Sequence, residues 1–386
     1  MDKYTVVTRE SWFSRLGNAL KGILVGILLL LGAVALLWWN EGRAILTAKG
    51  LTEGAGLVVS VASDQIDPGN NGKLVHVSGR ALTETALVDP DFPHMKAKAL
   101  VLLRRVEMFQ WREESQTKET KETGGSVVKE TTYSYSRVWS STLNDSSRFH
   151  LRNGHENPTS MPYGPLTLKA SDARVGAFRL PPGMLDLPAS ETLRAPDNAP
   201  AGNYKLAGGR IYMGENPDSP AIGDVRIEHL YAPEQDISLV AGQQGDSFAP
   251  FPVSGGKRNI QMLRPGLYDA QSMFNAAQDE NAMLTWLLRG LGLVAFFAGF
   301  YLILRPLSVL GDVVPLIGSI LNAGVALLAF CLSLICGLLV IALAWLYYRP
   351  LLGAALLLAT AAVLAGMIKL IKKSSRQKKQ ATNAAA

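Results

Sequence analysis

Four long apolar segments constrain this chain of 386 residues more than any other feature. They cover residues 20–39, 284–304, 323–348 and 351–371. Each is close to the ~20 apolar residues that a helix needs to cross the ~30 Å hydrocarbon core of a bilayer. A long polar segment separates the first from the second. The pattern therefore predicts an integral membrane protein, with a large water-exposed domain inserted between its first two spans.

The predicted fold class is a membrane protein of α+β type, with four transmembrane helices and a large β-rich exported domain. The chain divides into a cytoplasmic N-terminus (1–19), transmembrane helix 1 (20–39), the exported domain (40–283), transmembrane helix 2 (284–304), a cytoplasmic interfacial segment (305–322), transmembrane helix 3 (323–348), transmembrane helix 4 (351–371) and a basic cytoplasmic tail (372–386). The first apolar run exceeds the core of a secretory signal and lacks a small-residue cleavage site, so we expect it to be retained.

The placement of basic residues predicts the orientation. Of the formal net charge of +6, much lies at the chain ends: Lys3, Arg9, Arg15 and Lys21 surround the start of the first span, and Lys369, Lys372, Lys373, Arg376, Lys378 and Lys379 crowd the end of the fourth. Basic flanks of this kind favour the cytoplasm and anionic lipid headgroups. We therefore expect both termini in the cytoplasm and the large domain in a periplasm or an organelle lumen. The expected charged partner is the lipid bilayer, and no nucleic acid is expected.

The exported segment carries strand signals in its first half. Residues 100–111 form a β-prone run, residues 131–139 alternate between polar and larger side chains, and Gly124-Gly125 lies midway between them. This predicts one long hairpin whose charged tip, residues 112–129, projects into solvent; a partner-binding finger is the alternative. From residue 267 to 304 the chain lacks proline and is apolar at helical spacing, which predicts one helix running into the second span. Both cysteines, Cys331 and Cys336, lie in the third span, so we expect no disulfide in the exported domain.

No group of residues spells out a reaction. His150, His155 and Glu156 come nearest to a metal-binding cluster. Their spacing is not that of a zinc helix, and the neighbouring Gly154 and Pro158 indicate a loop, so we favour loop histidines without a metal; a metal-dependent exported enzyme is the alternative. The sequence also lacks a Gly-x-Ser-x-Gly elbow and a phosphate-binding loop. The prediction is a non-enzymatic protein without a cofactor.

Small residues four apart suggest close helix packing within the spans. The candidates are Gly22 with Gly26, Ala295 with Gly299, and Ala362 with Gly366. Arg289, near the start of the second span, is expected to extend its charge to the membrane surface. Residues 306–322 carry an apolar stripe at helical spacing. We interpret them as an amphipathic helix on the cytoplasmic face, with a re-entrant pore loop as the alternative.

Short blocks along the chain resemble the LUMA family, the transmembrane protein forty-three family. They comprise Trp39-Asn40-Glu41-Gly42-Arg43-Ala44, residues 53–60, 72–76, 103–108, 130–135, 155–158, 215–217, 223–226 and 245–246, and Trp345-Leu346-Tyr347-Tyr348-Arg349-Pro350. The blocks stand in the family's order and cover nearly the whole chain. The resemblance implies four spans and a large domain in the endoplasmic-reticulum lumen or perinuclear space of animals, or in the periplasm of bacteria. It supplies no catalytic residues.

The resemblance also implies a function. Animal members are viewed as self-associating organisers of protein complexes at the inner nuclear membrane, linked to lamins and emerin. The short N-terminus, basic tail and Ala/Gly-rich spans favour a bacterial inner membrane for this chain, and lamins and emerin apply only in an animal host. We therefore predict a non-enzymatic, homo-oligomeric membrane scaffold that binds other membrane or exported proteins. The alternative is a channel or transport component formed by helices 2–4.

Overall fold

The computed structural model describes residues 2–196 and 204–350. It separates into two compact units. A β-rich unit comprises Met1–Glu10, Ala48–Lys121 and Val127–Asp279, and a helical unit comprises Ser11–Thr47, Glu122–Ser126 and Glu280–Ala386. The predicted combination of apolar helices with a large β-rich region is therefore present.

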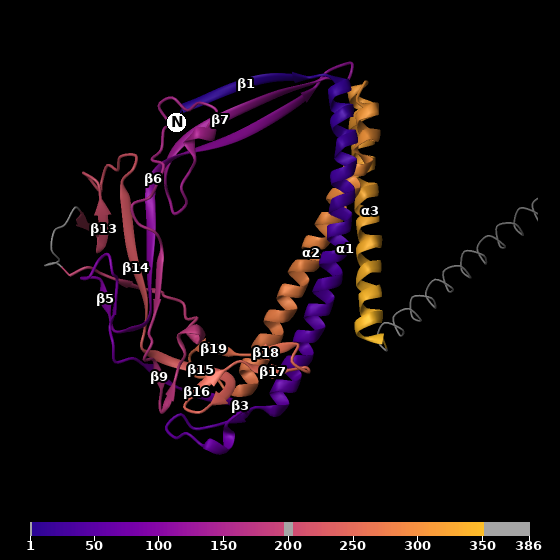
Figure 1. The fold of residues 1–386 in the computed structure, drawn as a ribbon. Coiled ribbons are helices and arrows are strands. Elements are labelled where there is room, and N and C mark those ends of the chain that lie inside the picture. Colours follow the sequence, from indigo (N-terminus) through magenta and orange to yellow (C-terminus); the bar gives the residue numbers. More distant parts are fainter. Residues whose placement is uncertain (1, 197–203, 351–386) are drawn as a thin grey trace, which may run out of the picture. The chain divides into compact units, whose positions relative to one another are not determined.

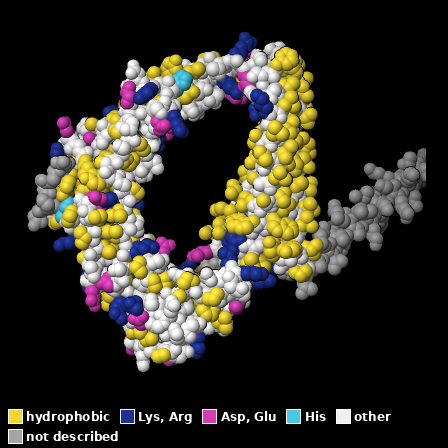
Figure 2. Space-filling model, in the orientation of Figure 1, with side chains coloured by type: hydrophobic (Ala, Val, Ile, Leu, Met, Phe, Trp, Pro, Cys, Tyr) yellow, Lys and Arg dark blue, Asp and Glu magenta, His cyan; other side chains and the backbone are white. Residues whose placement is uncertain are grey.

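Three helices are long and apolar enough to cross a membrane. They are α1 (Trp12–Leu57), α2 (Ala270–Gly311) and α3 (Pro315–Tyr348). The helical unit contains α3, α1 up to Thr47 and α2 from Glu280, and there the three lie side by side (Figure 1). Hydrophobic side chains cover the visible face of these helices (Figure 2). The predicted spans at 20–39, 284–304 and 323–348 lie within α1, α2 and α3. The predicted fourth span, 351–371, and the tail, 372–386, lie outside the described residues.

The predicted interfacial helix does not exist as a separate element. Helix α2 continues through Pro306 to Gly311, a short turn follows, and α3 begins at Pro315. Proline suits the first turn of a helix because its missing N–H would have no partner there. The apolar stripe of residues 306–322 is therefore divided between the last turns of α2 and the first turns of α3.

Two antiparallel sheets account for most of the β-rich unit. The first follows the order β1-β7-β6-β14-β13-β12, with β8 and β11 attached to β6 and β14. Its strands are β1 (Asp2–Glu10), β6 (Ala99–Lys121), β7 (Val127–Ser140), β8 (Leu166–Lys169), β11 (Glu191–Leu193), β12 (Lys205–Ala207), β13 (Arg210–Met213) and β14 (Val225–Pro233). The second follows the order β10-β9-β3-β15-β16, with β19 on β15 and with β2 parallel to β3. Its strands are β2 (Val59–Ser60), β3 (Leu74–Leu82), β9 (Arg174–Val175), β10 (Phe178–Arg179), β15 (Gln235–Gln244), β16 (Ser247–Ala249) and β19 (Met262–Pro265).

Two short hairpins complete the unit: β4 (Leu87–Val88) with β5 (Lys96–Ala97), and β17 (Phe251–Val253) with β18 (Arg258–Ile260). The largest core lies on the second sheet, where Val75, Leu239 and Phe178 are fully buried. Val75 of β3 and Leu239 of β15 contribute to this core. Leu74 and Val240, which alternate with them, belong to a second core, so both strands are buried on both faces over part of their length.

The predicted long hairpin is present as β6 and β7, paired from Met108 opposite Ser140 to Lys121 opposite Val127. Its turn contains Gly124 and Gly125 with φ of 90° and 80°. Few residues other than glycine adopt such angles, so the Gly-Gly pair explains where the hairpin turns. The turn, residues 122–126, belongs to the helical unit, where Gly124 donates a backbone hydrogen bond to the Val313 carbonyl at 3.1 Å. The expectation that the very tip projects freely into solvent is therefore wrong.

Residues 2–10, predicted as part of a cytoplasmic N-terminus, form β1 and pair with β7 over nine residue pairs. Hydrogen-bonded strands must lie in one compartment, because strands do not pair across a bilayer. While β1 is paired with β7, the N-terminus cannot be cytoplasmic if β7 is exported. The two predictions cannot both hold in that state. The orientation of the termini stays a prediction.

Candidate functional site

The predicted histidine cluster is not assembled as a metal site. His155 is buried, its ring stacks on Tyr135 with centroids 4.0 Å apart, and its Nδ1 lies 3.1 Å from the Leu151 carbonyl oxygen. The exposed His150 instead stacks on Tyr133 at 4.2 Å. No group of three potential ligands that could hold a metal ion occurs among the described residues. The two rings support the hairpin through aromatic contacts.

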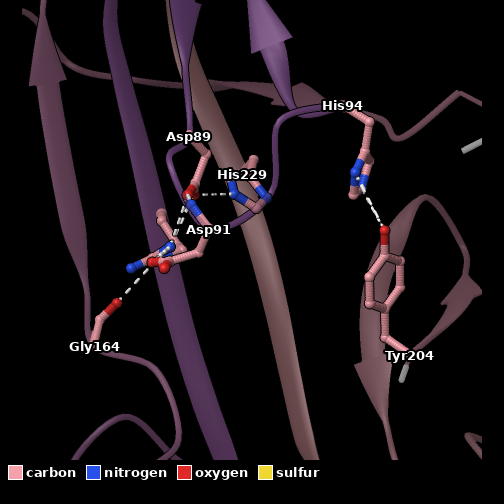
Figure 3. Close-up of polar contacts among 7 residues, drawn as sticks. Asp89, Asp91, His94, Gly164, Tyr204 and His229 are labelled. Atoms are coloured by element: carbon pink, nitrogen blue, oxygen red, sulfur yellow. Dashed lines mark hydrogen bonds and ion pairs between the residues drawn. The ribbon is translucent and has the colours of Figure 1, made fainter. Parts of the chain in front are cut away.

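The most deeply buried ion pairs of the β-rich unit centre on Asp89 (Figure 3). Its carboxylate, which is fully buried, accepts hydrogen bonds from Arg104 Nη1 at 2.8 and 3.1 Å and from His229 Nε2 at 2.8 Å. Arg104 Nη1 also contacts the half-exposed Asp91 at 2.7 Å, and its Nε donates to the Gly164 carbonyl at 3.0 Å. We call these side chains the Asp89 cluster.

Local structure explains how the cluster forms. Arg104 on β6 and His229 on β14 are directly opposite in the register, so their side chains point to the same face of the sheet. Asp89 immediately follows β4 and begins a tight loop, in which its Oδ1 accepts the backbone N–H of Asp91 at 2.9 Å. The buried Phe92 of this loop contacts the His229 ring edge-on at 5.9 Å. The cluster therefore fixes the loop onto the sheet.

The electrostatics favour a neutral His229. Burial lowers its pKa, although the hydrogen bond to Asp89 acts in the opposite direction. Nε2 then carries the proton that it donates to Asp89, while Nδ1 has no hydrogen-bond partner among the described residues. Burial also lowers the pKa of His94, whose ring stacks on Tyr204.

A His–Asp pair can serve as a general base, yet this one is badly placed for it. His229 is only 1% exposed and Asp89 0%, so a substrate in solvent has no access to either group. The described contacts of the pair include no serine, cysteine or threonine. A structural role fits better: Arg104 neutralises the carboxylate that begins the loop, and both Arg104 and His229 donate hydrogen bonds to it.

A second buried polar group joins the three helices of the helical unit. Glu41 on α1 is 1% exposed and accepts from Arg289 on α2 at 2.7 and 2.9 Å and from Trp345 Nε1 on α3 at 2.7 Å. Arg289 therefore pairs with a residue of α1. Its expected approach to the membrane surface stays a prediction. Nearby, Asn40 Nδ2 donates to the Thr285 carbonyl at 3.1 Å.

A third group lies at the other end of the same helices. Arg15 forms a short ion pair with the buried Asp312 and donates to the Gly125 carbonyl at 2.6 Å. Trp12 Nε1 donates to the Val309 carbonyl at 2.8 Å. Between Arg15 and Glu41 the helix rises about 39 Å, and its apolar part, residues 22–39, rises about 27 Å, close to the thickness of a bilayer's hydrocarbon core.

The predicted packing residues lie between these two groups. A Cβ added to Gly26 would lie 2.7 Å from the Gly299 carbonyl, and one added to Gly22 would touch Leu302. Ala295 packs against the apolar cluster of the three helices. Gly22, Gly26 and Gly299 thus face a helix of the same chain, while Ala362 and Gly366 lie outside the described residues.

The outer part of the first sheet is the strongest candidate for binding a partner. We call it the ribbon: β1, residues 112–121 of β6 and residues 127–136 of β7, which lie side by side (Figure 1). Residues 114–120 of β6 are all exposed, without the alternation of a strand that covers a core. In β1, Tyr4 is 45% and Val7 65% exposed. Val127 and Tyr135 of β7 are buried near the two ends of the ribbon, and between them the ribbon is largely exposed.

Sequence reasoning missed most of these groups for a common reason. Asp89 and His229 are 140 residues apart, and Glu41 and Arg289 are 248 apart. No local spacing connects such pairs. The β-branched run of residues 5–8 could have indicated β1.

Comparison with known proteins gives a consistent result. The family model described as Transmembrane protein 43 matches residues 108–350. The mouse protein named Transmembrane protein 43 is 35% identical over 364 residues, which cover 90% of each chain, and the human protein is 34% identical over 90% of each. A Drosophila melanogaster homolog is 29% identical over 88% of this chain and 92% of its own. No solved structure matches the chain.

Proposed function

We propose a scaffolding function for this chain, which belongs to the transmembrane protein 43 family. In this proposal it is a non-enzymatic, multi-pass membrane protein that self-associates and organises complexes of other membrane or exported proteins. The animal setting of lamins and emerin applies only if the host is an animal. In a bacterium the same role would operate at the inner membrane.

The ribbon is the observation that carries the proposal. Apart from Val127 and Tyr135 it buries little, and it leaves strand edges without a neighbouring strand in the described part of the chain. Such edges are where proteins add strands from a partner. The buried titratable groups support the same role, because the Asp89 cluster and the Glu41–Arg289 pair connect elements of the fold.

The channel alternative has less support. An ion pathway needs ionisable groups that face water between the helices. Within the helical unit Glu41 and Arg289 satisfy each other, and Trp345 occupies the second carboxylate oxygen. These groups therefore favour a rigid anchor.

Counting the copies in each assembly tests the proposal. The protein, extracted at native expression into polymer-bounded nanodiscs, is weighed by mass photometry. We expect assemblies of more than one copy whose mass includes other proteins. A uniform single copy without companions would contradict the scaffold.

A further inference from the structure

The ribbon has two strand edges without a partner strand among the described residues, one along β1 and one along the outer part of β6. We propose that the β1 edge of one copy pairs with the β6 edge of a second copy, so that the ribbons of successive copies join into a continuous sheet. This inference rests on the proposed self-association and names the surface that performs it.

The hydrogen-bonding direction of β6 follows from its neighbours. Trp111 N–H donates to Asn157, and its carbonyl accepts from Asn144 and Asn157, all away from β7. Backbone groups alternate in direction along a strand, so the odd-numbered residues of β6 direct N–H and C=O to the outer edge. From Glu113 to Glu119 no other described strand receives these groups.

The same alternation can be followed through β7 to β1. The backbone N–H and C=O groups of the odd-numbered β6 residues point to the outer edge. Those of the even-numbered residues therefore point to β7, where Gln116 is opposite Thr132. Odd residues of β7 then bond to even residues of β1. Lys3, Thr5 and Val7 therefore direct their backbone N–H and C=O groups to the outer edge of β1. The close approach of the Thr5 and Thr132 hydroxyls, 3.2 Å, agrees with a pair that exchanges no backbone hydrogen bond.

The two edges are parallel and level with each other. Thr5 and Gln116 both face Thr132, so residue i of β1 is level with residue i + 111 of β6. In a parallel ladder, each outward residue bonds to the two neighbours of the residue opposite it. An odd residue of β1 opposite an even residue of β6 meets this requirement. The level register therefore matches the hydrogen-bonding groups of both edges.

Charge supports that register. It places Lys3 opposite Glu114, and Glu10, which also pairs with Lys129 at 2.8 Å, opposite Lys121; Asp2 opposite Glu113 is its one like-charged pair. Sliding β1 by two residues toward the start of β6, so that residue i is opposite residue i + 109, would instead place Lys3 opposite Arg112 and Arg9 opposite Lys118. Glu114 already contacts Arg112 at 2.8 Å, but the side chains of Glu114 and Arg112 are 64% and 50% exposed, so exchanging that partner costs little.

Charge opposes pairing of β1 with itself. A two-fold axis perpendicular to the sheet, with full overlap of residues 3–9, would place Lys3 opposite Arg9 twice. Like charges directly opposite each other are destabilising. The β1–β6 contact uses different surfaces on the two copies, so it repeats from copy to copy and forms a ring or an open row.

Paired cysteines test the contact. In a background with Cys331→Ala and Cys336→Ala, the full chain carries both Thr5→Cys and Gln116→Cys and is oxidised in native membranes. Within one chain β7 separates the two positions by two strand spacings, about 9.6 Å, too far for a disulfide. We expect a ladder of disulfide-linked oligomers. The matched control carries Thr5→Cys and Thr120→Cys, which are out of register, and should give only background crosslinking.

Charge reversal supplies an independent readout. We expect Lys3→Glu or Glu114→Lys alone to lower the yield of linked oligomers about fivefold, and the double reversal to restore it. Lys257→Glu, on an exposed turn of the β-rich unit, should leave the yield unchanged.

Three results would overturn the inference: equal ladders in the paired and out-of-register variants, no ladder in either, or dimers from Thr5→Cys alone. The last would identify β1 as pairing with itself. If mass photometry still shows several copies, only the surface is wrong and the scaffold stands. A single copy there would remove both.

Discussion

At the scale of single residues, Asp89 is where the fold depends most on one charge. Replacing it with asparagine leaves Arg104 and His229 buried beside a weaker acceptor, and we expect a loss of about 3 kcal/mol in the free energy of unfolding. Asp91→Asn is the matched control: it contacts the same Arg104, but its carboxylate is 46% exposed, so the loss should stay below about 1 kcal/mol. Urea unfolding in detergent, followed by tryptophan fluorescence, measures both. Equal losses would mean that burial of Asp89 is not what matters.

Buried histidines predict a dependence on pH at the same scale. Burial lowers the pKa of His76 and of His229, so the folded state holds fewer protons than the unfolded state below pH ~6.5. Stability should therefore be complete above that value and fall as the pH is lowered toward the folded-state pKa. Melting temperatures at pH 7.5 and 5.5 measure the fall, which should be smaller in His229→Asn. A melting temperature that rises on acidification would contradict this assignment.

At the scale of elements, helix packing in the membrane depends on particular glycines. Gly26→Ala would place a methyl group within 3 Å of the Gly299 carbonyl and Ile303, and we expect about 1–3 kcal/mol of destabilisation from overpacking. Gly32, on the same helix, has nothing within 4 Å, so Gly32→Ala should be neutral or slightly stabilising. Thermal unfolding of the two variants in detergent compares them. Similar melting temperatures would place the α1–α2 contact elsewhere.

The pairing of β1 with β7 can be tested in the membrane by a crosslink within one chain. In the background with Cys331→Ala and Cys336→Ala, Thr5→Cys with Thr132→Cys should form a disulfide, because the two residues are opposite in the register. Thr5→Cys with Thr131→Cys, whose side chains point to opposite faces, should not. If neither pair forms a disulfide and a cysteine at position 5 is labelled only from the cytoplasm, β1 is not paired in the membrane.

At this scale the sequence predicts those elements whose structure is determined by neighbouring residues, and not those determined by contacts between distant residues. The long hairpin was predictable because strand alternation and Gly124-Gly125 are local signals, and the continuous α2 because no proline precedes Pro306 in it. The separate interfacial helix was wrong because an apolar period of 3.6 residues does not reveal where one helix ends and the next begins. The Asp89 cluster and the pairing of Arg289 with Glu41 depend on residues far apart in the chain.

At the scale of the whole molecule, we propose a membrane-anchored assembly protein. Its buried charges connect elements within each of the two units, and in this proposal its exposed ribbon supplies the edges for association. The family and the coarse architecture follow from comparison and structure together. The identity of the companions is the part that neither local patterns nor a single chain can contain.

The most direct test of the central claim is chemical crosslinking in native membranes at native expression, followed by affinity capture and mass spectrometry. The wild-type chain is compared with Lys3→Glu and with the matched Lys257→Glu. We expect self-crosslinks together with a recurring set of membrane or exported proteins, with self-crosslinks reduced only in Lys3→Glu. A monomer that crosslinks to nothing recurrent would contradict this claim.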